Sequence, residues 1–165
     1  MVVRASAVLF VLSLAVACSA PPPTAPAAAP FSVVEASIPD MQKALAEGRV
    51  TSRQLVEQYL QRIALYEKTL NATLAVNPKA LAEADTLDAE RKAGKLRGPL
   101  HGIPIALKDN IQTTNMPTSG GALAFKDYVP PYDATLVKNL KDAGAIIFAK
   151  STMSELAGAL AEPPT

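Results

Sequence analysis

The sequence predicts an α/β fold, and three successive segments carry that prediction. In residues 103–108 large aliphatic side chains occupy every second position, the period of two that is typical of a strand. Residues 133–143 predict a helix that Asp133 caps and Gly144 ends. Residues 145–149 are all apolar, as is typical of a strand buried on both faces. A strand, a helix and a second strand in this order predict a parallel βαβ unit.

Two helices are predicted ahead of this unit, in a folded part that begins near Phe31. Residues 38–47 predict a short helix, which Gly48 closes. Thr51 and Gln54 form a capping box that starts a second helix. The apolar face of this second helix follows the helical period and comprises Leu55, Val56, Tyr59, Leu60 and Ile63.

A short strand and a third helix are predicted between these helices and the βαβ unit. Residues 71–76 predict the strand. Asn77 and Pro78 then open the helix, with the asparagine as cap and the proline in the first turn. Gly94 ends it.

A polar loop and a last helix complete the predicted elements. Residues 112–121 follow the first strand of the βαβ unit as the loop. Thr152 and Glu155 form a second capping box, and the helix that they start ends at Pro163 and Pro164.

The composition indicates one folded domain and excludes two classes of function. Of the 165 residues, 49% are apolar and 19% are charged, so a packed core is expected rather than disorder. The 16 basic and 15 acidic side chains balance, and no basic stripe suggests a nucleic-acid partner. A single cysteine and a single histidine do not provide a metal site or an intramolecular disulfide.

The first 17 residues predict an export signal. Arg4 supplies the positive charge, and residues 5–16 supply an apolar segment too short to span a membrane comfortably. Small residues precede Cys18, as a signal peptidase requires. Residues 18–30 are a Pro/Ala-rich linker, which at ~3 Å per residue reaches about 35 Å.

Cys18 leaves two fates for the mature N-terminus. The segment before it resembles a bacterial lipobox, although Ala15 occupies the position where leucine is usual. Lipidation of Cys18 would anchor the protein to the outer membrane from the periplasm. The rival is ordinary cleavage after Ala17 or Ala20, which would leave a soluble exported protein. The sole cysteine of the chain lies at this site, and we therefore favour lipidation.

Lys108 is the candidate for chemistry, because it ends a strand of apolar residues. Burial disfavours the charged form of a lysine, and the neutral amine is a base. The alternative for such a lysine is a side chain that extends to water from the end of the strand.

The segment around Lys108 resembles a known family. Residues 98–110 (GPLHGIPIALKDN) are similar to the lysine-bearing segment of the amidase-signature hydrolases. Four further segments match in the same order: MPTSGG at 116–121, DAT at 133–135, AGA at 143–145 and KSTMSEL at 150–156. The resemblance covers residues 34–157, and among family members it is greatest to exported bacterial peptide amidases.

The resemblance implies a mixed sheet covered by helices and a Ser–Ser–Lys triad that hydrolyses carboxamides without a metal or a cofactor. Lys108 falls on the catalytic lysine of that triad. The substrate would be a small amide or a peptide amide. Both serines of the family lie in a Gly/Ser-rich stretch downstream of residues 150–156. We therefore expect residues 31–165 to be an N-terminal part of an amidase domain that lacks the two serines.

Other polar residues have weaker assignments. Asp109 and Asn110 follow the lysine and either orient it or form a turn. Ser119 and Gly120 belong to the loop that forms a wall of the family's site, and a Ser119–Lys108 dyad is disfavoured because no Ser-x-x-Lys spacing is present. Met153 lies in a segment that lines the family's substrate cleft, with core packing as the safer assignment. His101 is expected to be structural.

Two functions from different classes remain open. The first is an exported amidase, of which this chain carries only the catalytic lysine. The second is a catalytically inactive lipoprotein with a binding or structural role.

Overall fold

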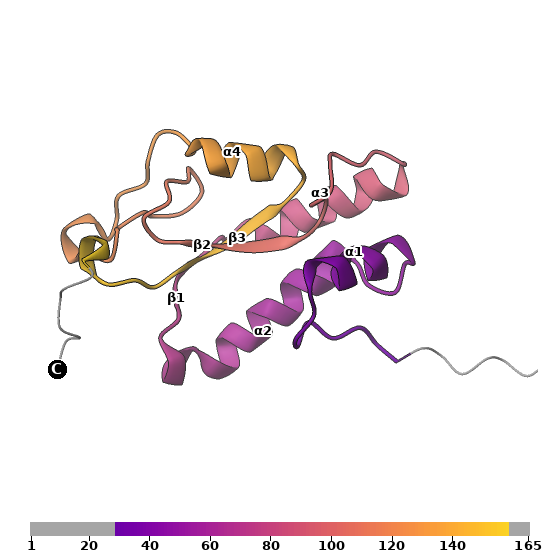
Figure 1. The fold of residues 1–165 in the computed structure, drawn as a ribbon, viewed down its shortest axis with the longest axis horizontal. Helices are drawn as coiled ribbons and strands as arrows, with labels where there is room; N and C mark the ends of the chain where they lie inside the picture. Colours follow the sequence, from indigo (N-terminus) through magenta and orange to yellow (C-terminus); the bar gives the residue numbers. More distant parts are fainter. Residues whose placement is uncertain (1–28, 159–165) are drawn as a thin grey trace, which may run out of the picture.

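The computed structural model describes residues 29–158, so the predicted signal segment, Cys18 and most of the linker lie outside the described residues. These residues form an α/β fold with a three-stranded sheet in the order β1-β3-β2 (Figure 1). The strands are β1 (Thr73–Val76), β2 (Pro104–Lys108) and β3 (Ile146–Ser151). Strand β2 is parallel to β3, and β1 is antiparallel to it. The predicted α/β fold with a mixed sheet is confirmed.

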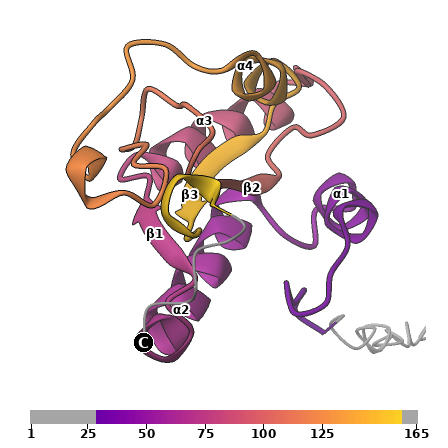
Figure 2. The ribbon, with the colours of Figure 1, turned by 60° about the vertical axis from the view of Figure 1, so that its left-hand side comes forward.

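The parallel pair is the predicted βαβ unit. Helix α4 (Thr135–Asp142) connects β2 to β3 and covers one face of the sheet, while α2 (Ser52–Leu70) and α3 (Ala80–Lys92) lie on the other (Figures 1 and 2). Side chains of β3 alternate between these layers, as the pleat of a strand requires. Ile146 and Phe148 pack with α2 and α3, and Ile147 packs with Val137 of α4.

The N-terminal helices begin where local sequence signals place them. In the predicted capping box of α2, the Gln54 amide donates to Thr51 Oγ1 (3.1 Å) and the Thr51 amide donates to Gln54 Oε1 (2.9 Å). Helix α1 (Ile38–Ala46) has a similar box between Ser37 and Asp40. Its buried face joins Leu55 and Ile103 in a separate core cluster. Satisfying the free amides of the first turn fixes both helix starts without help from distant residues.

The prediction that Asn77 caps α3 is wrong. The helix begins three residues later, at Ala80, with Lys79 at the cap position. Asn77 Oδ1 accepts the Lys79 amide (2.9 Å), and its Nδ2 donates to the carbonyl of Ile147 (3.0 Å). The asparagine is used to tie the α3 connection to β3, and a turn therefore precedes the helix.

The prediction that Asp133 caps α4 is also wrong. Ala134 occupies the cap position and no side chain caps the helix. Asp133 Oδ1 accepts the Thr114 amide (2.8 Å), and Oδ2 accepts from Lys141 Nζ (2.7 Å). Two partners from outside the first turn thus hold the carboxylate away from the helix amides.

The capping box predicted at Thr152 does not form. Thr152 donates its hydroxyl to the Asn71 carbonyl (2.8 Å) and its amide to the Ala72 carbonyl (2.9 Å). Only a short 3₁₀ turn follows, at Glu155–Ala157, and Leu156 within it has a positive φ of 49°. The attraction of Thr152 to the α2–β1 connection overrides the local helix signal; residues 159–165 lie outside the described part. No helix in residues 29–158 is long and apolar enough to span a bilayer.

Candidate active site

Lys108 is the last residue of β2, and its side chain is exposed. Ala106, two residues earlier, lines a groove of about 320 Å³ between the C-terminal half of α2 and the sheet. Alternate residues of a strand share a face, so Lys108 projects from the sheet face that this groove occupies. The groove is lined mainly by apolar and aromatic side chains, among them Tyr59, Ile63, Tyr66, Leu70 and Phe148.

Ser151 is the cross-strand neighbour of Lys108. The two residues are paired in the parallel register of β2 and β3, and Ser151 also lines the groove. Sequence reasoning did not single out this serine. Only the register of the two strands brings it beside the lysine, across 42 intervening residues of chain.

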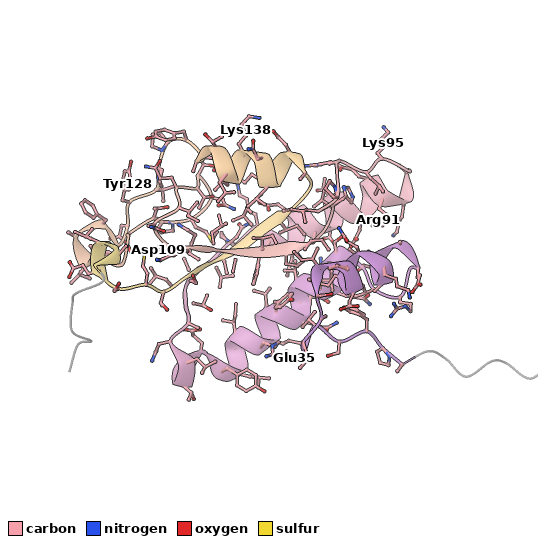
Figure 3. The ribbon with its side chains drawn as sticks, in the orientation of Figure 1. Glu35, Arg91, Lys95, Asp109, Tyr128 and Lys138 are labelled. Carbon is pink, nitrogen blue, oxygen red and sulfur yellow. The ribbon has the colours of Figure 1, made fainter. Side chains whose placement is uncertain are left out.

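Asp109, directly after Lys108, is completely buried and organises the loop that follows (Figure 3). Its Oδ2 accepts three hydrogen bonds: from the Ser119 amide (3.0 Å), the Ser119 hydroxyl (2.6 Å) and the Gly121 amide (3.2 Å). The loop thereby folds around the carboxylate. Of the two alternatives for Asp109, orientation and turn formation, the contacts favour orientation.

Lys150, and not Lys108, is the buried lysine of this region. It has no exposed surface, and its Nζ donates to Thr118 Oγ1 (2.9 Å), the Asp109 carbonyl (3.1 Å) and the Pro117 carbonyl (3.3 Å). Burial lowers the pKa of Lys150, and the carboxylate of Asp109, 3.5 Å from Nζ, opposes that shift. Sequence reasoning missed the role of Lys150, although a lysine directly after five apolar strand residues was a usable signal.

The structure places the weaker candidates around the loop. The Ser119 hydroxyl is engaged by Asp109, which gives no support to a dyad with Lys108. Gly120 has a φ of +61°, and its carbonyl accepts the Leu156 amide (2.7 Å). Met153 is half-buried and contributes to a shallow pocket beside Ser119 and Gly121.

A second cavity lies beside the same loop, where α4 begins. It has a volume of about 550 Å³, and its lining includes Asn110, Ser119, Tyr128 and Leu136 (Figure 3 labels Tyr128). Leu107 of β2 packs with Val137 of α4. Because Leu107 and Lys108 point to opposite faces, this cavity and the Lys108 side chain lie on different sides of the sheet.

His101 has both ring nitrogens engaged within the protein. Nδ1 accepts the Arg97 amide (3.1 Å), so Nε2 carries the proton and donates to the Leu87 carbonyl (2.9 Å). The buried ring therefore joins α3 to the approach of β2, in agreement with a structural role. Within residues 29–158, no three His, Cys, Asp or Glu side chains are grouped as a metal site would require.

Comparison with known proteins identifies the family. The profile of the Amidase family matches residues 54–162, and the chain belongs to this family. The structure resembles native peptide amidase from Stenotrophomonas maltophilia with a TM-score of 0.72 and 46% identity, over 75% of this chain and 26% of that one. It resembles an amidase family protein from Bacillus anthracis with a TM-score of 0.70 and 41% identity, over 74% and 25%.

Curated sequences give the same result. One component of the glutamyl-tRNA(Gln) amidotransferase from Rhodopirellula baltica is 43% identical over 122 residues, which are 73% of this chain and 24% of that protein. This chain thus spans about a quarter of the length of the relatives that it matches. For one relative, the peptide amidase, a complex with the competitive inhibitor chymostatin is known.

Proposed function

We propose that this chain carries the catalytic lysine, Lys108, of an amidase that hydrolyses the C–N bond of a carboxamide. One observation carries the proposal: Lys108 ends β2 in a chain that is 46% identical to a peptide amidase over the matched region. Its amine projects from the face of the sheet that holds an apolar groove. By analogy with the peptide amidase, the substrate class would be a peptide amide or a small amide.

In the Ser–Ser–Lys mechanism that the resemblance implies, the lysine accepts a proton through a bridging serine. The second serine then attacks the amide carbon, the amine leaves, and water releases the acyl group. A lysine is neutral at pH 7 only if its pKa falls from about 10.4 to near 7, which takes about 4–5 kcal/mol and requires burial. Lys108 is exposed here. The base therefore needs polypeptide that covers it and supplies the two serines.

The location of the enzyme is a further part of the proposal. Residues 1–17 would direct export, and Cys18 would be lipidated, so that residues 19–30 tether the folded part to the outer membrane. The support is the sequence pattern alone, because residues 1–28 lie outside the described part of the chain. Labelling with a clickable fatty acid tests this: mature protein without label in a soluble periplasmic fraction would leave ordinary cleavage.

Complementation tests the catalytic proposal. The full chain is purified and assayed with a peptide amide and a small aryl amide, alone and with a polypeptide containing the remaining three quarters of the S. maltophilia peptide amidase. We expect no turnover alone and turnover in the mixture. Lys108→Ala should abolish it, and Lys138→Ala, on the exposed face of α4, should not. Absence of turnover in every mixture would favour the alternative, a catalytically inactive lipoprotein with a binding role.

A further inference from the structure

The buried cluster around Lys150 joins three parts of the chain that meet beside Lys108. Lys150 belongs to β3 and lies opposite Leu107 in the register of the sheet. Its amine reaches past the end of β2 to the Asp109 carbonyl, and to the Pro117 carbonyl and the Thr118 hydroxyl of the loop. An ammonium has three donors, and each of them has an acceptor here.

The Asp109 carboxylate completes the cluster from the other side. Its Oδ2 receives the three hydrogen bonds from Ser119 and Gly121. Its Oδ1 is buried without a hydrogen-bond partner, and the charge beside it is the Lys150 ammonium at 3.5 Å. A buried carboxylate needs compensation, and Lys150 provides it.

This arrangement fixes the backbone on both sides of Lys108. Leu107 faces Lys150 across the sheet, and the Asp109 amide donates to the Ser151 carbonyl (3.1 Å). The loop at 117–121 contains no helix or strand, so its position depends on the contacts of its few anchors. The Lys150–Asp109 pair is the only ion pair in residues 29–158 whose two side chains are both at most 1% exposed.

We propose that Lys150 and Asp109 are positioning residues, a buried pair that sets the position of Lys108 by clamping the end of β2 to β3 and to the loop at 117–121. The catalytic meaning of this inference rests on the function proposed above. The charged groups of the pair are directed to each other and to the loop, so both residues act through the backbone that carries Lys108.

The first arm of the test measures amide hydrogen exchange on the full chain and does not depend on activity. In Lys150→Met the Ser119 and Gly121 amides should exchange about tenfold faster or more, because their acceptor loses its compensating charge. The Leu55 amide of α2, bonded to the Thr51 carbonyl, serves as the reference and should not change. The matched control Lys138→Met, labelled in Figure 3, should change none of them.

Two further variants separate the pair from a general loss of folding. Asp109→Asn keeps the shape of the side chain and should also raise exchange at Ser119 and Gly121. The double variant Asp109→Asn with Lys150→Met should exchange more slowly than Lys150→Met alone, since no unpaired carboxylate is left buried. Unchanged exchange at Ser119 and Gly121 in both single variants would overturn the inference. Loss of protection throughout the chain in both would also overturn it, because the pair would then support the whole core.

The second arm uses the complemented amidase. Lys150→Met should lower kcat by about tenfold or more while KM stays within about twofold, as expected when a catalytic group is displaced but the groove is intact. An equal loss confined to KM would contradict a positioning role. If the unmodified chain shows no turnover, the proposed function fails, and the exchange measurements still decide whether the pair clamps the strand end.

Discussion

Two lysines lie at the ends of neighbouring strands, one residue apart in the register of the sheet, and their surroundings are opposite. Lys108 pairs with Ser151 and projects from the groove face into solvent, whereas Lys150 pairs with Leu107 and has no exposed surface. The apolar residues before each lysine are similar, so local sequence does not separate them. The loop that folds back over one face of the sheet buries Lys150, and nothing in residues 29–158 covers Lys108 to the same extent.

This comparison teaches that burial and reactivity belong to different lysines here. Three protein acceptors and a carboxylate surround Lys150, which suits an ammonium that holds structure. Lys108 keeps its amine free at the edge of a groove. The proposed base is therefore held in position by a neighbouring lysine that takes no part in the chemistry.

The largest effect is expected at Lys108. In the complemented amidase, Lys108→Met should reduce kcat/KM by about 10³-fold or more, since a member of a catalytic triad is lost. Its stability in urea should change little, because the side chain is exposed. A variant that keeps more than a tenth of the activity would show that another residue is the base.

The reverse is expected for Lys150. Lys150→Met should lower the free energy of unfolding by about 3–5 kcal/mol, the cost of leaving one partner of a buried ion pair alone. Urea denaturation followed by circular dichroism measures this. The double variant with Asp109→Asn should recover part of the loss. A Lys150→Met chain as stable as the unmodified one would remove the contrast between the two lysines.

Gly121 tests how tightly the loop is held. Its φ is +75°, and a Cβ placed there would lie 2.8 Å from the Met153 carbonyl oxygen. Gly121→Ala should therefore destabilise the chain by about 1–3 kcal/mol through backbone strain and a close contact. Gly94→Ala is the matched control, because Gly94 also has a positive φ but no atom within 4 Å of that position. Equal losses in both variants would assign the effect to φ alone.

The smallest effect is a pH dependence. Burial lowers the pKa of Lys150 in the folded chain below its ordinary value of 10.5. Between that lowered pKa and about pH 10.5 the unfolded chain binds the proton and the folded chain does not, so this group makes stability rise with pH. The unmodified chain should thus gain stability relative to Lys150→Met as pH is raised through this window. Denaturation at a series of alkaline pH values measures the difference, and a gap that narrows with pH would contradict the shift.

The sequence by itself determined the local elements and the family. The capping box of α2 and the apolar strands at 103–108 and 145–149 form where they are predicted, because they depend on neighbours within a few residues. The segment around Lys108 indicated the family, and the family match confirms it.

Tertiary structure decided the partners of the polar side chains. Asn77, Asp133 and Thr152 each carry a valid local capping signal, and each is used instead by a strand, a lysine or a distant carbonyl. The same holds for the two lysines. Which of them is buried depends on strand register and on a loop that returns from residues 117–121, and such long-range contacts leave no periodic trace in the sequence.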